Sequence, residues 1–518
     1  MKRLLCLALC VLLLCGCGNA MGFTDIVKFE DMEYTRPDPS AAAASARAAM
    51  ELSRTARKPG EVLEAVWDFY DCYDEFMTAY DLSYIHYHAN QQDIYWQQEY
   101  EYCAANVPEL DLYLEELYVT LAESEHREAL EAEYFGAGWF DDYQYGQGYD
   151  DTLAALLGEE QLLIADYYDK IAESQDLAPT EFYDAYALPL AQLLAELAAL
   201  RQDIAAYSGY DSYTDFAWDW YYHRDYTPAQ AAAYLRDIRA LVPIYEGLSI
   251  PELFAVSEEP CDEEEVYGYV QSAAENLGGT AQEAFRLMDR AELCDIRTSA
   301  HKSGMSFELY LTKYSEPYIL VSGTGTRYDC LTFAHEFGHF CADYAAAGSA
   351  AGIDVMEVFS QAMELLSLDS AEDGGQLADM KLADVLCTFV EQAAYAAFEQ
   401  KLYELPKSEL TAEKLLALYE EVCTAYGFAA LEWDPRDLVT VPHFYSNPLY
   451  VISYVVSNDA ALQIYQLEQQ TPGAGRDIFL KSLTTEESFF LAFLEEAGLE
   501  APFGRVEAVK TLMEERLG

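Results

Sequence analysis

Residues 332–340 read Thr332-Phe333-Ala334-His335-Glu336-Phe337-Gly338-His339-Phe340 and contain the pattern His-Glu-x-x-His. If this stretch is helical, His335 and His339 lie one above the other on the same face, about 6 Å apart. Two imidazoles placed in this way can both reach one metal ion at about 2.0–2.1 Å. Glu336 lies about 100° further round the helix, beside the metal, where it can take a proton from a metal-bound water. The pattern is typical of zinc-dependent hydrolases.

A helical histidine pair can also belong to a solvated surface, but the flanking residues argue against this alternative. They make the helix apolar on more than one side: Leu331, Phe333, Ala334, Phe337 and Phe340. Such a helix is predicted to be buried. Buried imidazoles need polar partners, and one metal ion would satisfy both rings. We therefore interpret the two histidines as zinc ligands.

A third ligand is expected from another element, because catalytic zinc usually takes three protein ligands and leaves the fourth position to water. Residues 345–352, rich in Ala and Gly, are predicted to be a flexible connection to a second helix that opens with Asp354. That helix carries Glu357 and Glu364, which are seven residues apart and share a face. On spacing alone either carboxylate could be the ligand, and the other would belong to a hydrated acidic face.

Two short strands are predicted immediately before the histidine helix. Residues 305–312 and 317–322 are rich in aromatic and β-branched side chains. Gly323-Thr324-Gly325 then turns the chain toward the helix. A free edge of one of these strands could pair with an extended peptide, although structural pairing alone is the alternative.

The chain upstream is predicted to be helical from Ser40 to about Ala205. The clearest helices are expected at residues 40–56, 61–80, 108–133 and 180–207, with a loop at 136–151. Residues 209–226 are dense in aromatic side chains, which we interpret as core packing. Thr227 and Pro228 are a typical N-cap and first position of a further helix.

Residues 1–17 have the character of an export signal. Lys2 and Arg3 precede an apolar run over residues 4–14, which is too short to span a bilayer. The run ends in Leu14-Cys15-Gly16-Cys17, which resembles a bacterial lipobox with Cys17 as the lipidated residue. An ordinary signal peptide cleaved nearby is the alternative. We expect an exported lipoprotein on the extracytoplasmic face of a bacterial cell membrane, attached only through its lipid anchor.

Composition limits the remaining classes of function. The chain has 518 residues, 52% of them hydrophobic, and can bury a large core. Its formal net charge of −61 argues against binding nucleic acid through a basic surface. Eight cysteines follow the signal segment without a C-x-x-C pair, which argues against a cysteine zinc site. Whether they form disulfides or stay as buried thiols is left open.

Several motifs together resemble the thimet oligopeptidase and oligoendopeptidase F family of zinc metallopeptidases, especially its bacterial oligoendopeptidase F-like branch. The helix Glu357-Val358-Phe359-Ser360-Gln361-Ala362-Met363-Glu364 matches the family pattern Glu-x-x-Ser-x-x-x-Glu. The late segment 442–454 resembles the family's His-Phe pair followed by two tyrosines. Further landmarks are residues 34–38, 224–227 and 302–304. The resemblance therefore covers nearly the whole mature chain.

The resemblance implies roles for single residues. By the family pattern Glu357 is the third zinc ligand, and His443, Tyr450 and Tyr454 are the candidates for stabilising the oxyanion of the tetrahedral intermediate. It also implies two mostly helical lobes around a deep channel that admits short peptides, with a small sheet beside the active-site helix. We expect four parts: a signal peptide (1–17), a linker and N-terminal segment (18–39), an N-terminal helical region (40–205) and a catalytic region (206–518).

The predicted function is a zinc-dependent endopeptidase that cleaves short peptides through attack of a zinc-bound water assisted by Glu336. We expect one zinc ion per chain, a monomer, and no nucleic-acid partner. A surface lipoprotein that binds peptides without cleaving them is one alternative, although a pure binder has no need of Glu336. A zinc carboxypeptidase on a similar helical scaffold is the other.

Overall fold

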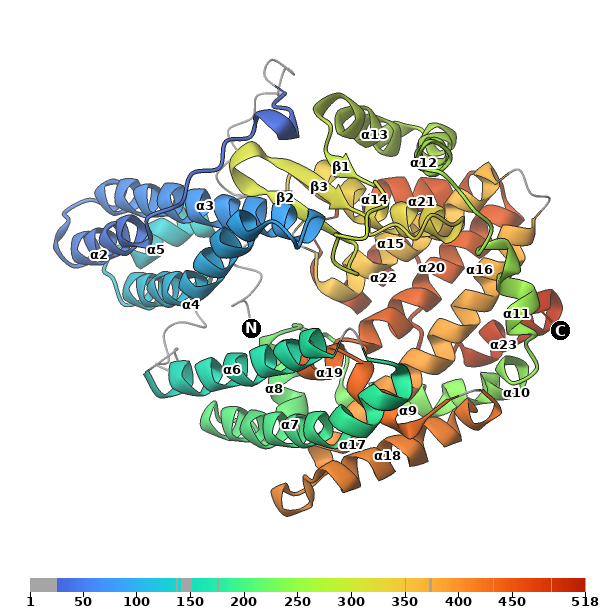
Figure 1. Ribbon diagram of the computed structural model, residues 1–518. Helices are drawn as coiled ribbons and strands as arrows, with labels where there is room; N and C mark the ends of the chain where they lie inside the picture. The colour runs from blue at the N-terminus through green and yellow to red at the C-terminus, as the bar shows by residue number, and fades with distance from the viewer. Residues whose placement is uncertain are drawn as a thin grey trace.

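The protein is mostly α-helical, with two lobes and one small sheet, as predicted (Figure 1). A computed structural model describes residues 26–136, 138–140, 151–174, 177–349, 351–371, 375–431, 433–485 and 487–517. One lobe holds the first helices and the sheet, and the other holds the helices from α6 to α9 together with α17 to α19. Helices α16 and α20 lie between them. The histidine helix, α14, belongs to the first lobe and packs against α15 at the centre of the molecule.

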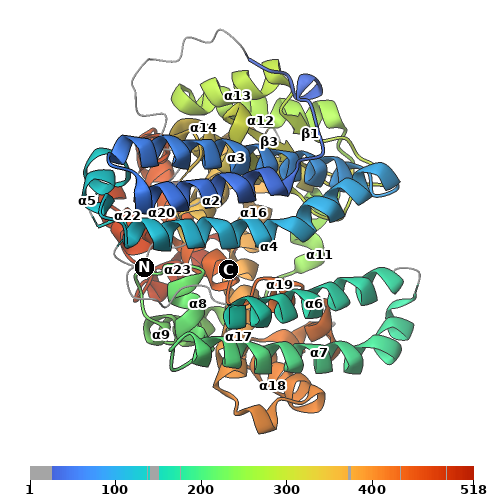
Figure 2. The ribbon, with the colours of Figure 1, turned by 90° about the vertical axis from the view of Figure 1, so that its left-hand side faces the viewer.

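The first four helices form a layer with its own hydrophobic core (Figure 2). They are α2 (Pro39–Thr55), α3 (Pro59–Ala89), α4 (Ile94–Ala122) and α5 (Arg127–Leu130), followed by a π-helical turn (Glu131–Phe135). The first begins with Pro39 after Asp38, whose carboxylate accepts the Ser40 N–H at 2.9 Å. The predicted helices at 40–56 and 61–80 are both present, and the second continues to Ala89. Most of the predicted loop at 136–151 lies outside the described residues.

The predicted start of a helix at Pro108 is wrong, because α4 begins 14 residues earlier, at Ile94, and runs through that proline. Its N-cap is Asp93, whose carboxylate accepts the N–H groups of Tyr95 and Trp96. A proline inside a helix removes one backbone hydrogen bond, and it is tolerated where the surrounding packing outweighs that cost. Here Leu110 and Leu114, just after the proline, are buried against α2 and α3.

The second lobe contains the long helices α6 and α7 and the helices that pack on them. Its elements are α6 (Asp151–Glu173), α7 (Pro179–Tyr207), α8 (Tyr213–Trp220), α9 (Pro228–Ile238), α17 (Ala393–Glu404), α18 (Ala412–Ala425) and α19 (His443–Ser446). Thr227 caps α9 in a capping box with Gln230, as the Thr-Pro pair predicts. The aromatic stretch before it is core, with Tyr213, Phe216 and Trp218 all buried. Helices α6 and α7 belong to this lobe, whereas α2–α5 belong to the other, although all of them precede the predicted boundary or end close to it. The boundary at 205/206 stays a prediction.

The sheet has three strands in the order β1-β3-β2. The two predicted strands are present as β2 (Phe307–Leu311) and β3 (Glu316–Leu320), paired antiparallel with Leu309 opposite Tyr318. The third, β1 (Cys294–Asp295), pairs parallel with β3 and is too short for a sequence pattern to reveal. Within the described residues, β2 has β3 on one side and no strand on the other.

The remaining helices surround α14 and α15. They are α10 (Val242–Tyr245), α11 (Ile250–Leu253), α12 (Glu263–Leu277), α13 (Gly279–Ala291), α14 (Tyr328–Ala346), α15 (Ile353–Ser367), α16 (Gln376–Cys387), α20 (Ile452–Gln470), α21 (Ala474–Ser482), α22 (Phe490–Ala497) and α23 (Val506–Leu517). Helix α15 lies between α14 and α20 and contacts both. These three helices carry most of the residues of the candidate site.

Further sequence expectations concern the N-terminal signal segment, membrane-spanning helices and the cysteines. Cys17 and the whole signal segment lie outside the described residues. Among the helices of the described ranges, none is both long and apolar enough to cross a membrane. The eight cysteines after the signal segment are free thiols in the structure, four of them buried.

Candidate metal centre and active site

Helix α14 presents its two histidines on the one face that the core leaves partly open. Leu331, Phe333, Ala334, Phe337 and Phe340 are each at most 1% exposed, so the predicted burial of this helix is confirmed. The rings of His335 and His339 have centroids 5.1 Å apart. The four-residue spacing therefore places both imidazoles next to each other on one side of α14, as the sequence pattern predicts.

The close approach of α15 to this face depends on Gly338. A β-carbon on Gly338 would lie 2.5 Å from the carbonyl oxygen of Phe359 and 2.6 Å from the α-carbon of Ser360. Both distances are well inside van der Waals contact, so only glycine allows the two helix backbones to come this near. The glycine between the two histidines thus brings the middle of α15, with Glu357, alongside the histidine pair.

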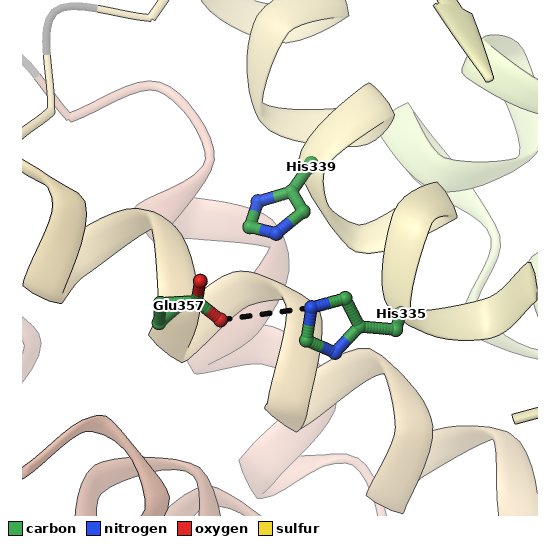
Figure 3. A group of neighbouring side chains, drawn as sticks. All are labelled: His335, His339 and Glu357. Carbon is green, nitrogen blue, oxygen red and sulfur yellow. Dashed lines mark ion pairs between the residues drawn. The ribbon is translucent and has the colours of Figure 1, made fainter. Parts of the chain in front are cut away.

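His335, His339 and Glu357 form a compact group (Figure 3). Each offers one ligand atom, and these atoms all lie within 4.8 Å of one another. His335 Nε2 lies 3.6 Å from Glu357 Oε2. In Figure 3 the two rings and the carboxylate point toward a common space between α14 and α15. Two imidazole nitrogens and one carboxylate oxygen are a donor set that suits zinc.

Glu364 has a different place from Glu357, which separates the two carboxylates that spacing alone could not. Its Oε1 lies 2.9 Å from His335 Nδ1, the ring nitrogen turned away from Glu357. Its other oxygen lies 2.6 Å from Lys381 Nζ, which is also 2.7 Å from Asp384. A carboxylate on the second nitrogen of a metal-binding histidine fixes the ring orientation and the tautomer. The geometry gives Glu364 this orienting position.

The charges around the histidines favour a cation at the group. Burial opposes a positive charge on His335, but the hydrogen bond to Glu364 and the negative charge of that carboxylate outweigh burial and raise the ring pKa to about 9. Burial and the neighbouring His335 lower the pKa of His339 well below its ordinary value, which leaves this ring neutral with a free lone pair. A metal ion bound here would balance the negative charges of the carboxylates around His335.

Glu336 lies beside the candidate ligand group and is not one of its three members. It is 7% exposed and lines a cavity of about 350 Å³ together with His335 and Tyr454. Burial raises the pKa of its carboxyl to about 7, and the nearby His335 opposes this shift. A carboxylate with a pKa near the working pH can both accept a proton and return it.

The three late residues also come together at this site. The ring centroid of His443 lies 5.6 Å from that of Tyr450 and 6.0 Å from that of Tyr454. Tyr450 donates a hydrogen bond from its hydroxyl to Glu357 Oε1 at 2.7 Å. Tyr454 instead lines the cavity beside Glu336. Burial lowers the pKa of His443, so this ring is neutral near pH 7.

One residue that positions this machinery is Arg224, which belongs to the family landmark at 224–227 but received no role from the sequence. Its side chain is fully buried, and its guanidinium contacts Asp354 at 3.3 Å, one turn before Glu357 on α15. It also donates to the carbonyl of Leu449 at 3.0 Å and to the hydroxyl of Ser453 at 2.9 Å, on either side of Tyr450. Leu449 has a left-handed backbone with φ of 64°, which is strained for a leucine. Arg224 therefore ties the tyrosine segment to the ligand helix.

The sequence held a weak signal for Arg224. It falls in an aromatic stretch, and its guanidinium lies 4.4 Å from the ring centroid of Trp218 and 4.2 Å from that of Tyr222. An arginine among buried aromatic side chains needs a carboxylate or carbonyl partner. The sequence alone offered no means to choose that partner.

The fold and the site define a helical metallopeptidase, and comparison with known proteins agrees. A profile of the peptidase M3 N-terminal domain matches residues 29–146, and a profile of peptidase family M3 matches residues 147–485. The chain belongs to peptidase family M3. It is thus a hydrolase that acts on peptide bonds. Among curated proteins, none matches this sequence.

Solved structures share the fold over nearly the whole chain. A candidate oligoendopeptidase F has a TM-score of 0.82 at 21% identity, with 95% of this chain and 98% of that chain covered. PZ peptidase A with an inhibitor has a TM-score of 0.82 at 19% identity, with 95% and 99% covered. A candidate oligoendopeptidase F from Bacillus anthracis str. Ames has a TM-score of 0.79 at 20% identity, with 95% and 98% covered. These likenesses establish the fold.

Proposed function

We propose that the chain is a zinc-dependent oligoendopeptidase that hydrolyses internal bonds of short peptides, with one zinc ion held by His335, His339 and Glu357. The convergence of these three ligand atoms within 4.8 Å is the observation that carries the proposal. Zinc in such a site acts as a Lewis acid toward the scissile carbonyl and the attacking water. Glu364 orients the ring of His335 through its Nδ1 atom.

Proton transfer in this proposal belongs to Glu336. Its carboxylate takes a proton from the attacking water and then delivers it to the leaving amine. Tyr454, which lines the same cavity, supplies a hydroxyl donor to the oxyanion, and His443 lies next to it as a neutral donor. Tyr450 holds Glu357 through its hydroxyl and so acts on the ligand carboxylate.

Binding of an extended peptide is supported by the sheet. Strand β2 lies at one edge of the sheet and contacts both α3 and α14. An unpaired strand edge can bind the backbone of a substrate by adding it as a further strand. Backbone pairing of this kind is independent of the substrate's sequence, which suits an enzyme for varied short peptides.

The test is Glu336→Gln, which keeps the size of the side chain and removes its basicity. We expect bound zinc to be retained and cleavage of an internally quenched peptide to fall at least about a hundredfold. His335→Ala is the matched control, because it should lose zinc and activity together. Near-wild-type cleavage by Glu336→Gln would refute the assigned base. A peptide blocked at both ends separates an endopeptidase, which cleaves it, from a carboxypeptidase, which does not.

We also propose that the mature enzyme is a monomeric lipoprotein anchored through Cys17 on the extracytoplasmic face of the cell membrane. The basic start, the short apolar run and Gly16-Cys17 support this location. Cys17→Ala should release the protein from the membrane fraction or leave its signal uncleaved. Normal anchoring of that variant would contradict the proposal.

A further inference from the structure

The cavity beside the metal-ligand group is a candidate subsite for a substrate side chain. It has a volume of about 350 Å³ and is lined by residues from α14, α15, α16 and α20. His335 and Glu336 form part of its wall, so a side chain bound there would lie close to the cleaved bond. The volume is at the lower end for small-ligand sites, which suits one long side chain.

The wall of this cavity has more carboxylates than Lys or Arg side chains among the described residues. It carries the carboxylates of Glu364, Asp384 and Glu391, while Lys381 is the one Lys or Arg among the described lining residues. Lys381 is 7% exposed and is shared between Glu364, at 2.6 Å, and Asp384, at 2.7 Å. Lys381 thus pairs with two of these three carboxylates, and Glu391 is left without a Lys or Arg partner among the described residues.

Glu391 differs from the other two carboxylates in its partners. It accepts a hydrogen bond from the Tyr245 hydroxyl at 2.8 Å, and no described Lys or Arg pairs with it. Burial, reinforced by the negative charge of Asp384, raises the pKa of Glu391. Asp384 is 20% exposed and faces the same cavity. A cation placed between these two carboxylates would relieve their repulsion.

A π-helical turn directs this part of the wall into the cavity. Helix α16 ends at Cys387, and Thr388–Gln392 form a π-helical turn before α17 begins. Thr388, Glu391 and Gln392, all from this turn, line the cavity. Such turns re-aim side chains and occur frequently at functional sites. The local backbone therefore places a carboxylate where a regular helix would direct a different residue.

We propose that this cavity is a subsite for a cationic side chain, lysine or arginine, of the peptide substrate, and that Asp384 and Glu391 select it. The inference rests on the proposed peptidase function and adds a substrate class to it. The net charge of −61 attracts any cationic peptide, wherever its lysine lies. A subsite differs from this general attraction because it favours lysine at one position relative to the cleaved bond.

The test compares internally quenched peptides in which one residue is lysine or norleucine, which has a similar length and no charge. The residue is moved through each position around the cleaved bond, so net charge stays constant along the lysine series. We expect one position at which lysine raises kcat/KM about tenfold over norleucine, and Glu391→Gln should reduce that ratio about fivefold. Asp384→Asn gives a second, independent variant. Glu404→Gln, an exposed carboxylate at the end of α17, is the matched control and should leave the ratio unchanged.

The outcomes distinguish this subsite from the function on which it rests. Equal cleavage of lysine and norleucine peptides at every position would overturn the subsite and leave the peptidase function intact. A lysine preference at all positions that disappears in about 0.5 M salt would also overturn it, because long-range attraction is screened there. A positional preference that survives in both variants would overturn the assignment to these carboxylates. Failure of the zinc-loaded enzyme to cleave any peptide would overturn both proposals.

Discussion

Replacing Gly338 by alanine should destroy the metal site while leaving the fold largely intact. The added β-carbon would lie 2.5 Å from the Phe359 carbonyl oxygen, whereas ordinary contacts begin at 3.4 Å. Helices α14 and α15 must therefore move apart locally by roughly 1 Å, the difference between these distances. Zinc ligands tolerate errors of about 0.2 Å, so Glu357 would be carried out of reach of the histidine pair.

The expected cost to folding is small compared with the cost to metal binding. Overpacking of this kind destabilises by about 1–3 kcal/mol, and alanine in place of a helical glycine returns about 0.5–1 kcal/mol. A net loss of about 0–2.5 kcal/mol leaves a domain with a stability of about 5–15 kcal/mol folded. Zinc affinity should fall at least about a hundredfold, the upper range for changes around a metal's ligands.

The assay is zinc titration against a competing chelator, together with thermal unfolding with and without zinc. Wild-type protein should unfold at a higher temperature when zinc is added, and Gly338→Ala should lose most of that increase. Gly268→Ala is the matched control, because Gly268 is also helical and a β-carbon there meets nothing within 4 Å. It should keep full zinc affinity. Wild-type zinc affinity and cleavage in Gly338→Ala would refute the argument from helix approach.

Four further changes test the rest of the site. Tyr454→Phe should lower kcat about a hundredfold or more with zinc retained, because it removes an oxyanion donor, whereas Tyr450→Phe should weaken zinc about tenfold, because Glu357 loses a hydrogen bond. Arg224→Met should lower the free energy of unfolding by about 3–5 kcal/mol, measured in urea, because the Asp354 carboxylate stays buried without its ion pair. Removal of metal with a chelator should abolish peptide cleavage, and about one equivalent of zinc should restore it.

Each of these changes has its own control and contradicting result. The two tyrosine variants control one another, and equal effects on zinc affinity would contradict the separate roles. Arg236→Met, at an exposed position of α9, should change the free energy of unfolding by less than about 0.5 kcal/mol. A similar small change for Arg224→Met would contradict its structural role. Full cleavage after complete removal of metal would contradict the proposed chemistry.

Local sequence patterns were enough to predict the short-range features of this protein. Helical spacing put His335 and His339 on one face of α14, apolar flanking residues predicted its burial, and Thr227-Pro228 marked the start of α9. Such features depend on neighbours within one or two turns of the chain. Pro108 was misread for the complementary reason. Tertiary packing outweighed its local preference, and α4 continued through it.

Spacing along the chain left the choice between Glu357 and Glu364 open, and it is the packing of α15 on α14 that puts Glu357 in the candidate ligand group and Glu364 on the other side of His335. Glu357 and Glu364 share one face of α15, and periodicity cannot tell which one points to Nε2 and which to Nδ1 of His335. The answer depends on the position of α15 along α14, and Gly338 allows the two helix backbones to approach closely at this point. The partners of Arg224 lie 130 and more residues away along the chain. Contacts at such separations follow from the packing of whole helices, because a local pattern carries no information about distant partners.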